Sequence, residues 1–222
     1  MRNPNIRLIY EINVTRPFLY RPPPAPLHIL YEDDHILVAD KPSELLSVPG
    51  KADDHKDCLE TRLRALYPEI LLIHRLDLAT SGVMVFARTA EAQRHIGLQF
   101  EKRYTEKTYV ARVAGHIKGD SGRINLPLIT DWPNRPKQHV DFERGKSSQT
   151  DWEVIDRDET STRLHLYPKT GRSHQLRVHM LAIGHPILGD RLYADDAAFE
   201  AAERLQLHAH KLRLRHPDGG RW

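Results

Sequence analysis

The residues from His74 to Gly82, with the sequence HRLDLATSG, set an arginine and an aspartate two positions apart, shortly before a glycine. The apolar run 83–88 that follows is typical of a strand buried on both faces. Asp77 would then lie on a loop that a rigid strand holds in place, where functional carboxylates are often found. A carboxylate held in this way could act as a nucleophile. The alternative, a weak surface ion pair between Arg75 and Asp77, stays open on these residues alone.

A second group of polar residues, in the segment 171–179, follows a predicted strand and opens a predicted helix. Ser173 is expected to cap this helix, which would end at Gly184. Arg172, Ser173 and His174 would then gather at its N-terminus, where free backbone amides and the helix dipole favour a bound phosphate. The competing interpretation is a basic helix face that contacts only solvent.

The segment 131–138, with the sequence DWPNRPKQ, combines an aromatic residue with two basic ones in a loop that contains two prolines. This combination suits RNA, because Trp132 could stack on an unpaired base while Arg135 and Lys137 contact phosphates. A loop that prolines hold in shape also loses less entropy on binding. A surface turn around a buried Trp132 is the alternative.

Arg177 and Tyr109 could complete a site around Asp77. Arg177 lies one turn along the predicted helix from Ser173, and its guanidinium could pair in a fork geometry with a buried carboxylate, for which Asp77 is the candidate. Tyr109 lies in a predicted strand and could present its ring to a base. A place in the core is the more common position of such a tyrosine, so both interpretations of Tyr109 stay open.

The sequence argues against three other kinds of site. The chain has 14 histidines but one cysteine, and His174 and His179 are not spaced as in a common zinc motif, so we expect no metal. Ser81 could serve a hydrolase in principle, but the glycine that a nucleophile elbow needs two residues earlier is absent. The glycine patterns that bind nucleotide phosphates are absent as well.

The elements that would position these residues are strands and helices in irregular alternation. Strands are predicted where β-branched and aromatic residues alternate or run together, and helices where apolar residues recur every three or four positions. The predicted strands are a first one that begins at Ile36 and is stopped by Pro42, then 83–88, 108–115, 150–157 and 163–169; the predicted helices are 57–67, 90–102, 173–183 and 195–205. Without repeats or linkers, a single α+β domain around a mixed sheet is expected.

The composition is that of an ordinary globular protein, with 40% hydrophobic and 28% charged residues. The chain has no apolar stretch near the roughly 20 residues that span a membrane and no signal-peptide pattern, so we expect it in the cytoplasm. Cys58 cannot form an intramolecular disulfide and is expected to be buried. A net charge of +3 permits nucleic-acid binding without requiring it. The proline-rich residues 1–27 are expected to form an extended arm.

Together these motifs resemble those of the RluA family of pseudouridine synthases, over residues 28–217. The family's signatures are matched by the segments 74–82 (catalytic aspartate), 171–179 (arginine motif) and Tyr109 to Ala111 (tyrosine motif). The segments 46–50, 131–137 and 184–190 resemble the RluA branch itself. The resemblance implies a catalytic domain over 28–222 without the S4 RNA-binding domain of several relatives, and an α+β fold whose active-site cleft crosses a mixed, mostly antiparallel sheet flanked by helices and loops.

The resemblance also implies a role for each candidate residue. Asp77 would be the nucleophile that attacks the target uridine or its sugar, so that the N-glycosidic bond breaks and the base rejoins through carbon. Arg75 would enter the RNA stack as a wedge and hold the uridine out. Arg177 would pair with Asp77 and keep it ionised. Tyr109 would stack on the extruded base and help to remove the proton from its carbon. RNA contacts are expected from Arg172, His174, Trp132, Arg135 and Lys137.

The implied reaction is an isomerisation of structured RNA that needs no cofactor and is carried out by a monomer without an obligate protein partner. For the RluA branch the implied targets are uridine 32 in the tRNA anticodon stem-loop and uridine 746 in a 23S rRNA loop. Two alternatives stay open: a non-catalytic RNA-binding or RNA-folding factor with the same fold, and a metal-free hydrolase that acts on a small ester.

Overall fold

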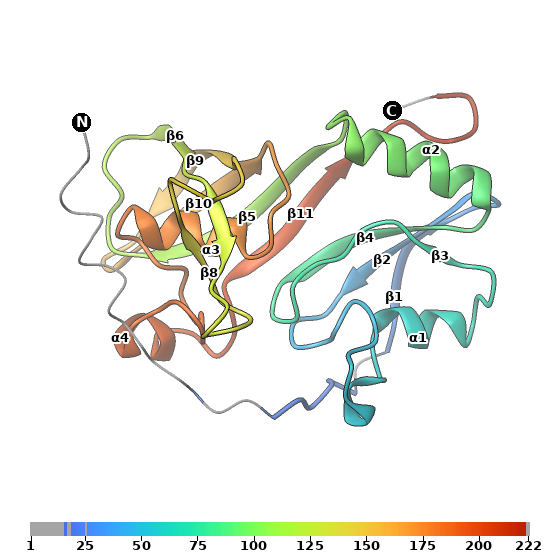
Figure 1. Ribbon diagram of the computed structural model, residues 1–222, viewed down its shortest axis with the longest axis horizontal. Coiled ribbons are helices and arrows are strands. Elements are labelled where there is room, and N and C mark those ends of the chain that lie inside the picture. The colour runs from blue at the N-terminus through green and yellow to red at the C-terminus, as the bar shows by residue number, and fades with distance from the viewer. Residues whose placement is uncertain (1–15, 17–18, 25, 221–222) are drawn as a thin grey trace. The chain divides into compact units, whose positions relative to one another are not determined.

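The computed structural model describes residues 16, 19–24 and 26–220, drawn as a coloured ribbon in Figure 1. Its packing divides the chain into two units, each named here after one candidate residue. The Asp77 unit comprises Phe18–Thr108 and His208–Trp222, and the Arg177 unit comprises Met1–Pro17 and Tyr109–Leu207. Most of the expected N-terminal arm lies outside the described residues. That residues 28–222 form a single domain stays a prediction.

The sheet of the Asp77 unit is built around β4, a strand buried along most of its length, as the apolar run 83–88 predicts. The strands follow the order β1 (His28–Glu32), β2 (Ile36–Lys41), β4 (Ser81–Ala87) and β11 (Leu207–Arg213), with the short β3 (Leu71–Leu72) also paired to β4. The strand that begins at Ile36 is therefore the second, not the first as expected. β1 is mostly exposed, so it lacks the apolar alternation by which a strand is recognised.

The described residues of this unit also form two helices and one 3-10 turn, Asp53–His55. α1 (Leu59–Arg64) is shorter than the predicted 57–67 and is capped by the buried Cys58, whose sulfur accepts a hydrogen bond from the Thr61 amide. α2 (Ala90–Glu101) matches the predicted 90–102 closely. Its Ile96 packs with Val85 of β4, so α2 covers one face of this sheet (Figure 1). In the part of the chain that the structure describes, no helix is long and apolar enough to cross a lipid bilayer.

The Arg177 unit contains an antiparallel sheet and a separate hairpin. The sheet follows the order β5 (Glu106–Ala114), β10 (Ser161–Pro168), β9 (Gln149–Arg157) and β6 (Ser121–Asn125), and the hairpin pairs β7 (Leu128–Thr130) with β8 (Gln138–Val140). The chain passes from the Asp77 unit into this one within β5. The three longest strands were predicted, whereas β7 and β8 are too short to show a period in the sequence and β6 has a single apolar side chain, Ile124.

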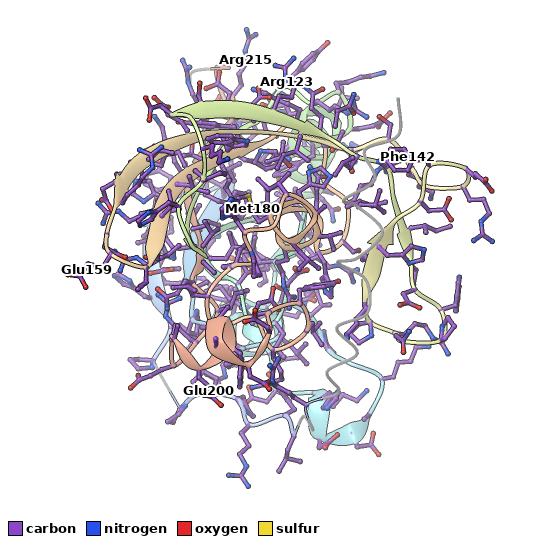
Figure 2. The ribbon with its side chains drawn as sticks, turned by 90° about the vertical axis from the view of Figure 1, so that its left-hand side faces the viewer. Arg123, Phe142, Glu159, Met180, Glu200 and Arg215 are labelled. Atoms are coloured by element: carbon purple, nitrogen blue, oxygen red, sulfur yellow. The ribbon has the colours of Figure 1, made fainter. Side chains whose placement is uncertain are left out.

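One helix, α3 (Gln175–Ala182), lies between the hairpin and the sheet strand β10 (Figure 1). It contributes Val178 to an apolar cluster that also holds Leu128 and Val140 of the hairpin. In Figure 2, Met180 of α3 lies among the interior side chains, while Phe142, just after the hairpin, projects outward. α4 (Asp196–Glu200) is shorter than the predicted 195–205.

Among the strand pairs given above, those with a printed register are antiparallel except β4 with β11. Among the described residues strands outnumber helices, and the helices occur in the connections between strands. The expected α+β class with mixed, mostly antiparallel strands is therefore confirmed.

Candidate active site

Asp77 lies on the loop 73–80, which joins β3 to β4. The Asp77 carbonyl accepts a hydrogen bond from the Thr80 amide at 3.1 Å, which closes a turn just before β4. The Asp77 side chain is half-buried, whereas Arg75 is exposed. The loop thus holds a carboxylate at the surface of its unit and presents a guanidinium to solvent two residues earlier.

The segment that follows β2 holds the backbone of this loop. The Ser47 hydroxyl donates to the Leu76 carbonyl at 2.7 Å and accepts from the Leu76 amide at 3.1 Å. The Ser43 hydroxyl donates to the Ala79 carbonyl at 2.7 Å. Both peptide groups of Leu76, the residue between Arg75 and Asp77, are therefore fixed by one buried serine.

A lysine with no exposed surface, Lys41, provides a third anchor. Its ammonium donates to the carbonyls of Pro42, Leu45 and Leu78 at 2.9, 2.6 and 2.9 Å. Burial lowers the pKa of Lys41 to about 7, although the nearby carboxylates, Asp77 among them, oppose this shift. When protonated, Lys41 places a positive charge in the neighbourhood of Asp77.

The start of β4 tolerates only glycine at position 82. Gly82 has φ of +118°, and a Cβ atom there would collide with the Ala209 backbone of the parallel strand β11. The neighbouring Ser81 is buried, and its hydroxyl lies 2.9 Å from Nδ1 of His208. Ser81 is the first residue of a strand and not part of a strand-to-helix turn, so this contact does not form a nucleophile elbow.

His74, at the start of the loop, has a structural role. Its Nε2 accepts a hydrogen bond from the Val85 amide at 3.1 Å, and its ring stacks on Phe100 with 4.8 Å between centroids. Burial, assisted by the charge of Lys107, lowers the pKa of His74 to about 4, so the imidazole is neutral at pH 7. A neutral ring suits the acceptor role of Nε2.

In the Arg177 unit, Arg177 is buried and makes a bidentate salt bridge with Asp190, at 2.8 Å and 2.6 Å. Its guanidinium carbon also lies 5.0 Å from the centroid of the Tyr193 ring. The interpretation of Arg177 as part of a solvated basic face is therefore wrong. Its pairing with Asp77, which belongs to the other unit, stays a prediction.

The N-terminus of α3 differs from the expectation. The N-cap is His174, with φ of 52°, and not Ser173. The left-handed backbone of His174 brings its Nδ1 to 2.7 Å from the Tyr193 hydroxyl. The side-chain oxygen of Gln175 accepts from the Arg172 amide at 3.0 Å, so one donor of the expected phosphate site already has a partner within the protein. Arg172 is exposed.

The loop between β7 and β8 presents the residues expected to bind RNA. Trp132 is 65% exposed, so the alternative of a buried tryptophan is wrong. The Arg135 guanidinium lies over the Trp132 ring, 4.7 Å from its centroid. The Asp131 amide donates to the Lys137 carbonyl at 2.9 Å, which closes the loop at its base.

Tyr109 lies in β5 opposite Leu166 of β10. It shares a face of the strand with Ala111 and Val113, both buried, but is itself only half-buried. Tyr109 thus stands at the edge of a packed face, where a ring can both pack and contact a ligand.

Residues 35–182 match the family model described as RNA pseudouridylate synthase. The chain is 58% identical to the dual-specificity RNA pseudouridine synthase RluA of Yersinia pestis, over 86% of this chain and 94% of the relative. It is 56% identical to the protein of the same name from Escherichia coli (strain K12), over 90% of this chain and 93% of the relative. The chain belongs to the RNA pseudouridylate synthase family. As a pseudouridine synthase it is an isomerase that modifies RNA.

A solved structure supports the same family at the level of the fold. Human RNA pseudouridylate synthase domain containing 1 superposes with a TM-score of 0.74 and 29% identity, over 91% of this chain and 82% of that one. The expected pseudouridine synthase fold is therefore confirmed.

Four residues that support the candidate site of this pseudouridine synthase were not among the sequence candidates: Lys41, Ser47, Asp190 and Tyr193. Each acts on a partner through a contact that no local pattern shows. The sequence did carry signals for three of them: a lysine at the end of the apolar strand before Pro42, a serine within the family-like segment 46–50, and an aspartate at the end of the segment 184–190.

Proposed function

We propose that this pseudouridine synthase modifies two classes of RNA, a tRNA anticodon stem-loop at uridine 32 and a 23S rRNA loop at uridine 746. The observation that carries the proposal is the identity of 56–58% with relatives whose names state dual specificity, over nearly the whole of both chains. The two RNA classes come from the resemblance to the RluA branch. We also infer a monomer that works in the cytoplasm, where both RNAs are found.

In the proposed reaction Asp77 is the nucleophile. Its carboxylate attacks the uridine or its ribose and forms a bond to it, the bond between N1 and C1′ breaks, and the base turns. A bond from C5 to C1′ then forms, the bond to Asp77 breaks so that the carboxylate is restored, and the proton lost from C5 is balanced by one gained at N1. Support comes from the fixed backbone on both sides of Asp77 and from the buried Lys41 near it. A nucleophile whose loop is preorganised loses less entropy in the transition state.

The remaining roles concern the extruded uridine. Arg75 is exposed on the same loop, so its side chain can enter the stack in place of the base. Tyr109, half-buried at the edge of a packed face, would stack on the base and take part in removing its proton. Arg177 would pair with Asp77 while its other contacts, to Asp190 and Tyr193, hold the guanidinium in place.

Contacts outside the reacting base would come from the loop between β7 and β8 and from the start of α3. Trp132 offers an exposed ring, and Arg135 and Lys137 offer positive charge for phosphates. Arg172 and His174 would add contacts beside them.

The test uses RNA that carries tritium at C5 of uridine. The wild-type protein is expected to release label from both a tRNA anticodon stem-loop and the 23S rRNA loop, because forming the bond at C5 expels its hydrogen. Asp77→Asn, which keeps the shape of the side chain, is expected to bind RNA without releasing label. Binding without release by the wild type would instead favour the RNA-binding factor, and full activity of Asp77→Asn would exclude Asp77 as the nucleophile.

A further inference from the structure

Tyr193 stands where three parts of the Arg177 unit meet. Its side chain is 5% exposed and packs in the apolar cluster with Leu128, Val140 and Val178. These residues come from both strands of the hairpin and from α3. A tyrosine in such a cluster usually directs its hydroxyl to a specific partner, since an unpaired buried hydroxyl is costly.

The hydroxyl of Tyr193 is in contact with two residues at the predicted RNA surface, one next to Lys137 and the other His174 itself. The Gln138 amide donates to it at 2.8 Å, and Gln138 directly follows Lys137 at the end of the loop 131–137. On the other side lies Nδ1 of His174, at 2.7 Å. The arrangement suits a hydroxyl that accepts from the amide and donates its proton to the imidazole. One oxygen thus joins the base of the loop to the N-cap of α3.

The backbone at His174 is consistent with this link. A residue other than glycine with φ near 52° adopts a conformation that costs on the order of 1 kcal/mol and persists only where its surroundings fix it. The conformation turns the imidazole toward Tyr193 and is unrelated to capping, because the His174 side chain makes no capping hydrogen bond.

The segment around Tyr193 is held by contacts that do not involve the hydroxyl. The Asp190 carboxylate accepts from the amides of Leu192 and Tyr193, at 2.9 Å and 3.3 Å, and also binds Arg177. The ring remains against Arg177 and the apolar cluster. Removing the hydroxyl alone should therefore free the loop without unfolding the unit.

We infer that Tyr193 is a positioning residue for RNA binding, whose hydroxyl fixes the loop 131–137 against the N-cap of α3. This inference rests on the proposed function, in which Trp132 and Arg135 of the loop and His174 at the cap contact the same RNA. With the hydroxyl in place, the loop and the N-cap of α3 form a surface that is preorganised for RNA binding. Without it, RNA binding must order the loop and bear that entropy cost.

The experiment measures tritium release from the anticodon stem-loop by Tyr193→Phe. KM is expected to rise about 5- to 10-fold while kcat stays within about twofold, because ground-state binding and the transition state lose the same contact. The matched control is Tyr167→Phe, which removes a hydroxyl bonded to Glu153 in the same unit and should leave both constants unchanged. An unchanged KM in Tyr193→Phe, or an equal rise in the control, would overturn the inference.

Two further measurements separate positioning from general weakening. In an Arg135→Ala background, Tyr193→Phe should raise KM by a smaller factor than in the wild-type background, since part of the effect of the hydroxyl acts through Arg135; fully additive effects would contradict this. Amide hydrogen exchange at Gln138 should be faster in Tyr193→Phe than in the wild type, and equal rates would also contradict the link. If the wild type released no label, the proposed reaction would fail, while RNA binding and exchange would still decide the role of Tyr193.

Discussion

The hydroxyl of Ser47 offers a direct test of how the loop 73–80 is held. Ser47 is 3% exposed and Leu76 is 9% exposed, and the two hydrogen bonds between them, at 2.7 Å and 3.1 Å, satisfy the amide and the carbonyl of Leu76. Ser47→Ala would leave both groups without this partner. A buried polar group that loses its partner costs about 1–3 kcal/mol, so the two groups together should lower the free energy of unfolding by about 2–6 kcal/mol.

The same substitution should slow the reaction. Leu76 lies between Arg75 and Asp77, so freeing its peptide groups lets the carboxylate leave its position. A displacement of about 1 Å can cost about 100-fold in rate, and we expect kcat to fall about 10- to 100-fold. Amide hydrogen exchange at Leu76 should accelerate in parallel, which would locate the change at the loop.

Urea unfolding at pH 7 and tritium release measure the two effects, with Ser43→Ala as the matched control. Ser43 donates a single bond, to the half-buried carbonyl of Ala79, which water can reach after the substitution. The control should lose about 1 kcal/mol or less. The reasoning is refuted if Ser47→Ala unfolds within about 0.5 kcal/mol of the wild type, or if both serine variants lose equal stability.

Four further substitutions have expected outcomes. Gly82→Ala should prevent stable folding in urea titrations, because of its positive φ and the collision with Ala209, whereas Gly97→Ala, in open space on α2, should stabilise by about 0.5–1 kcal/mol. Burial lowers the pKa of His179 to about 4, so protonation of His179 should cost the fold about 3 kcal/mol as pH falls from 6.5 to 4, in addition to the cost of protonating the buried His74; His179→Gln should lack the His179 share of this loss. Arg135→Ala should weaken RNA binding and reduce its salt slope by about 1.

For each of these expectations, one outcome would contradict the reasoning. Wild-type stability of Gly82→Ala would mean that β11 does not lie against Gly82. An unchanged pH dependence in His179→Gln would show that another group titrates. A salt slope equal to that of the wild type in Arg135→Ala would return the loop to a purely structural role.

The elements that the sequence predicts well are those in which a hydrophobic pattern extends over many residues. The apolar run of β4 and the repeat that includes Ile96 in α2 were enough to place both elements, because burial on a regular face leaves a pattern. β1 and the hairpin strands carry no such pattern, since β1 is exposed and each hairpin strand has three residues. Short elements owe their conformation to their neighbours.

The residues of the candidate site also fall into two groups: those that a local motif indicates and those that only the folded chain brings together. Asp77 and Arg75 are proposed as site residues from a local motif, but the contacts that hold their loop come from Ser47, 29 residues from Leu76, and from Lys41, 37 residues from Leu78. Ser173 was expected at the N-cap of α3 because serine is a frequent cap. The left-handed conformation of the next residue, which depends on distant contacts, moved the cap by one position.

The parallel pairing of β4 with β11 has a consequence for the order of synthesis. Ser81 and Gly82 pair with His208 and Ala209, and the whole of Tyr109–Leu207 lies between them in the chain. When the first 207 residues have emerged from the ribosome, the whole Arg177 unit is present, but the start of β4 still has an unpaired edge. Unpaired strand edges invite association with other chains, so the nascent protein is most exposed to aggregation just before β11 emerges.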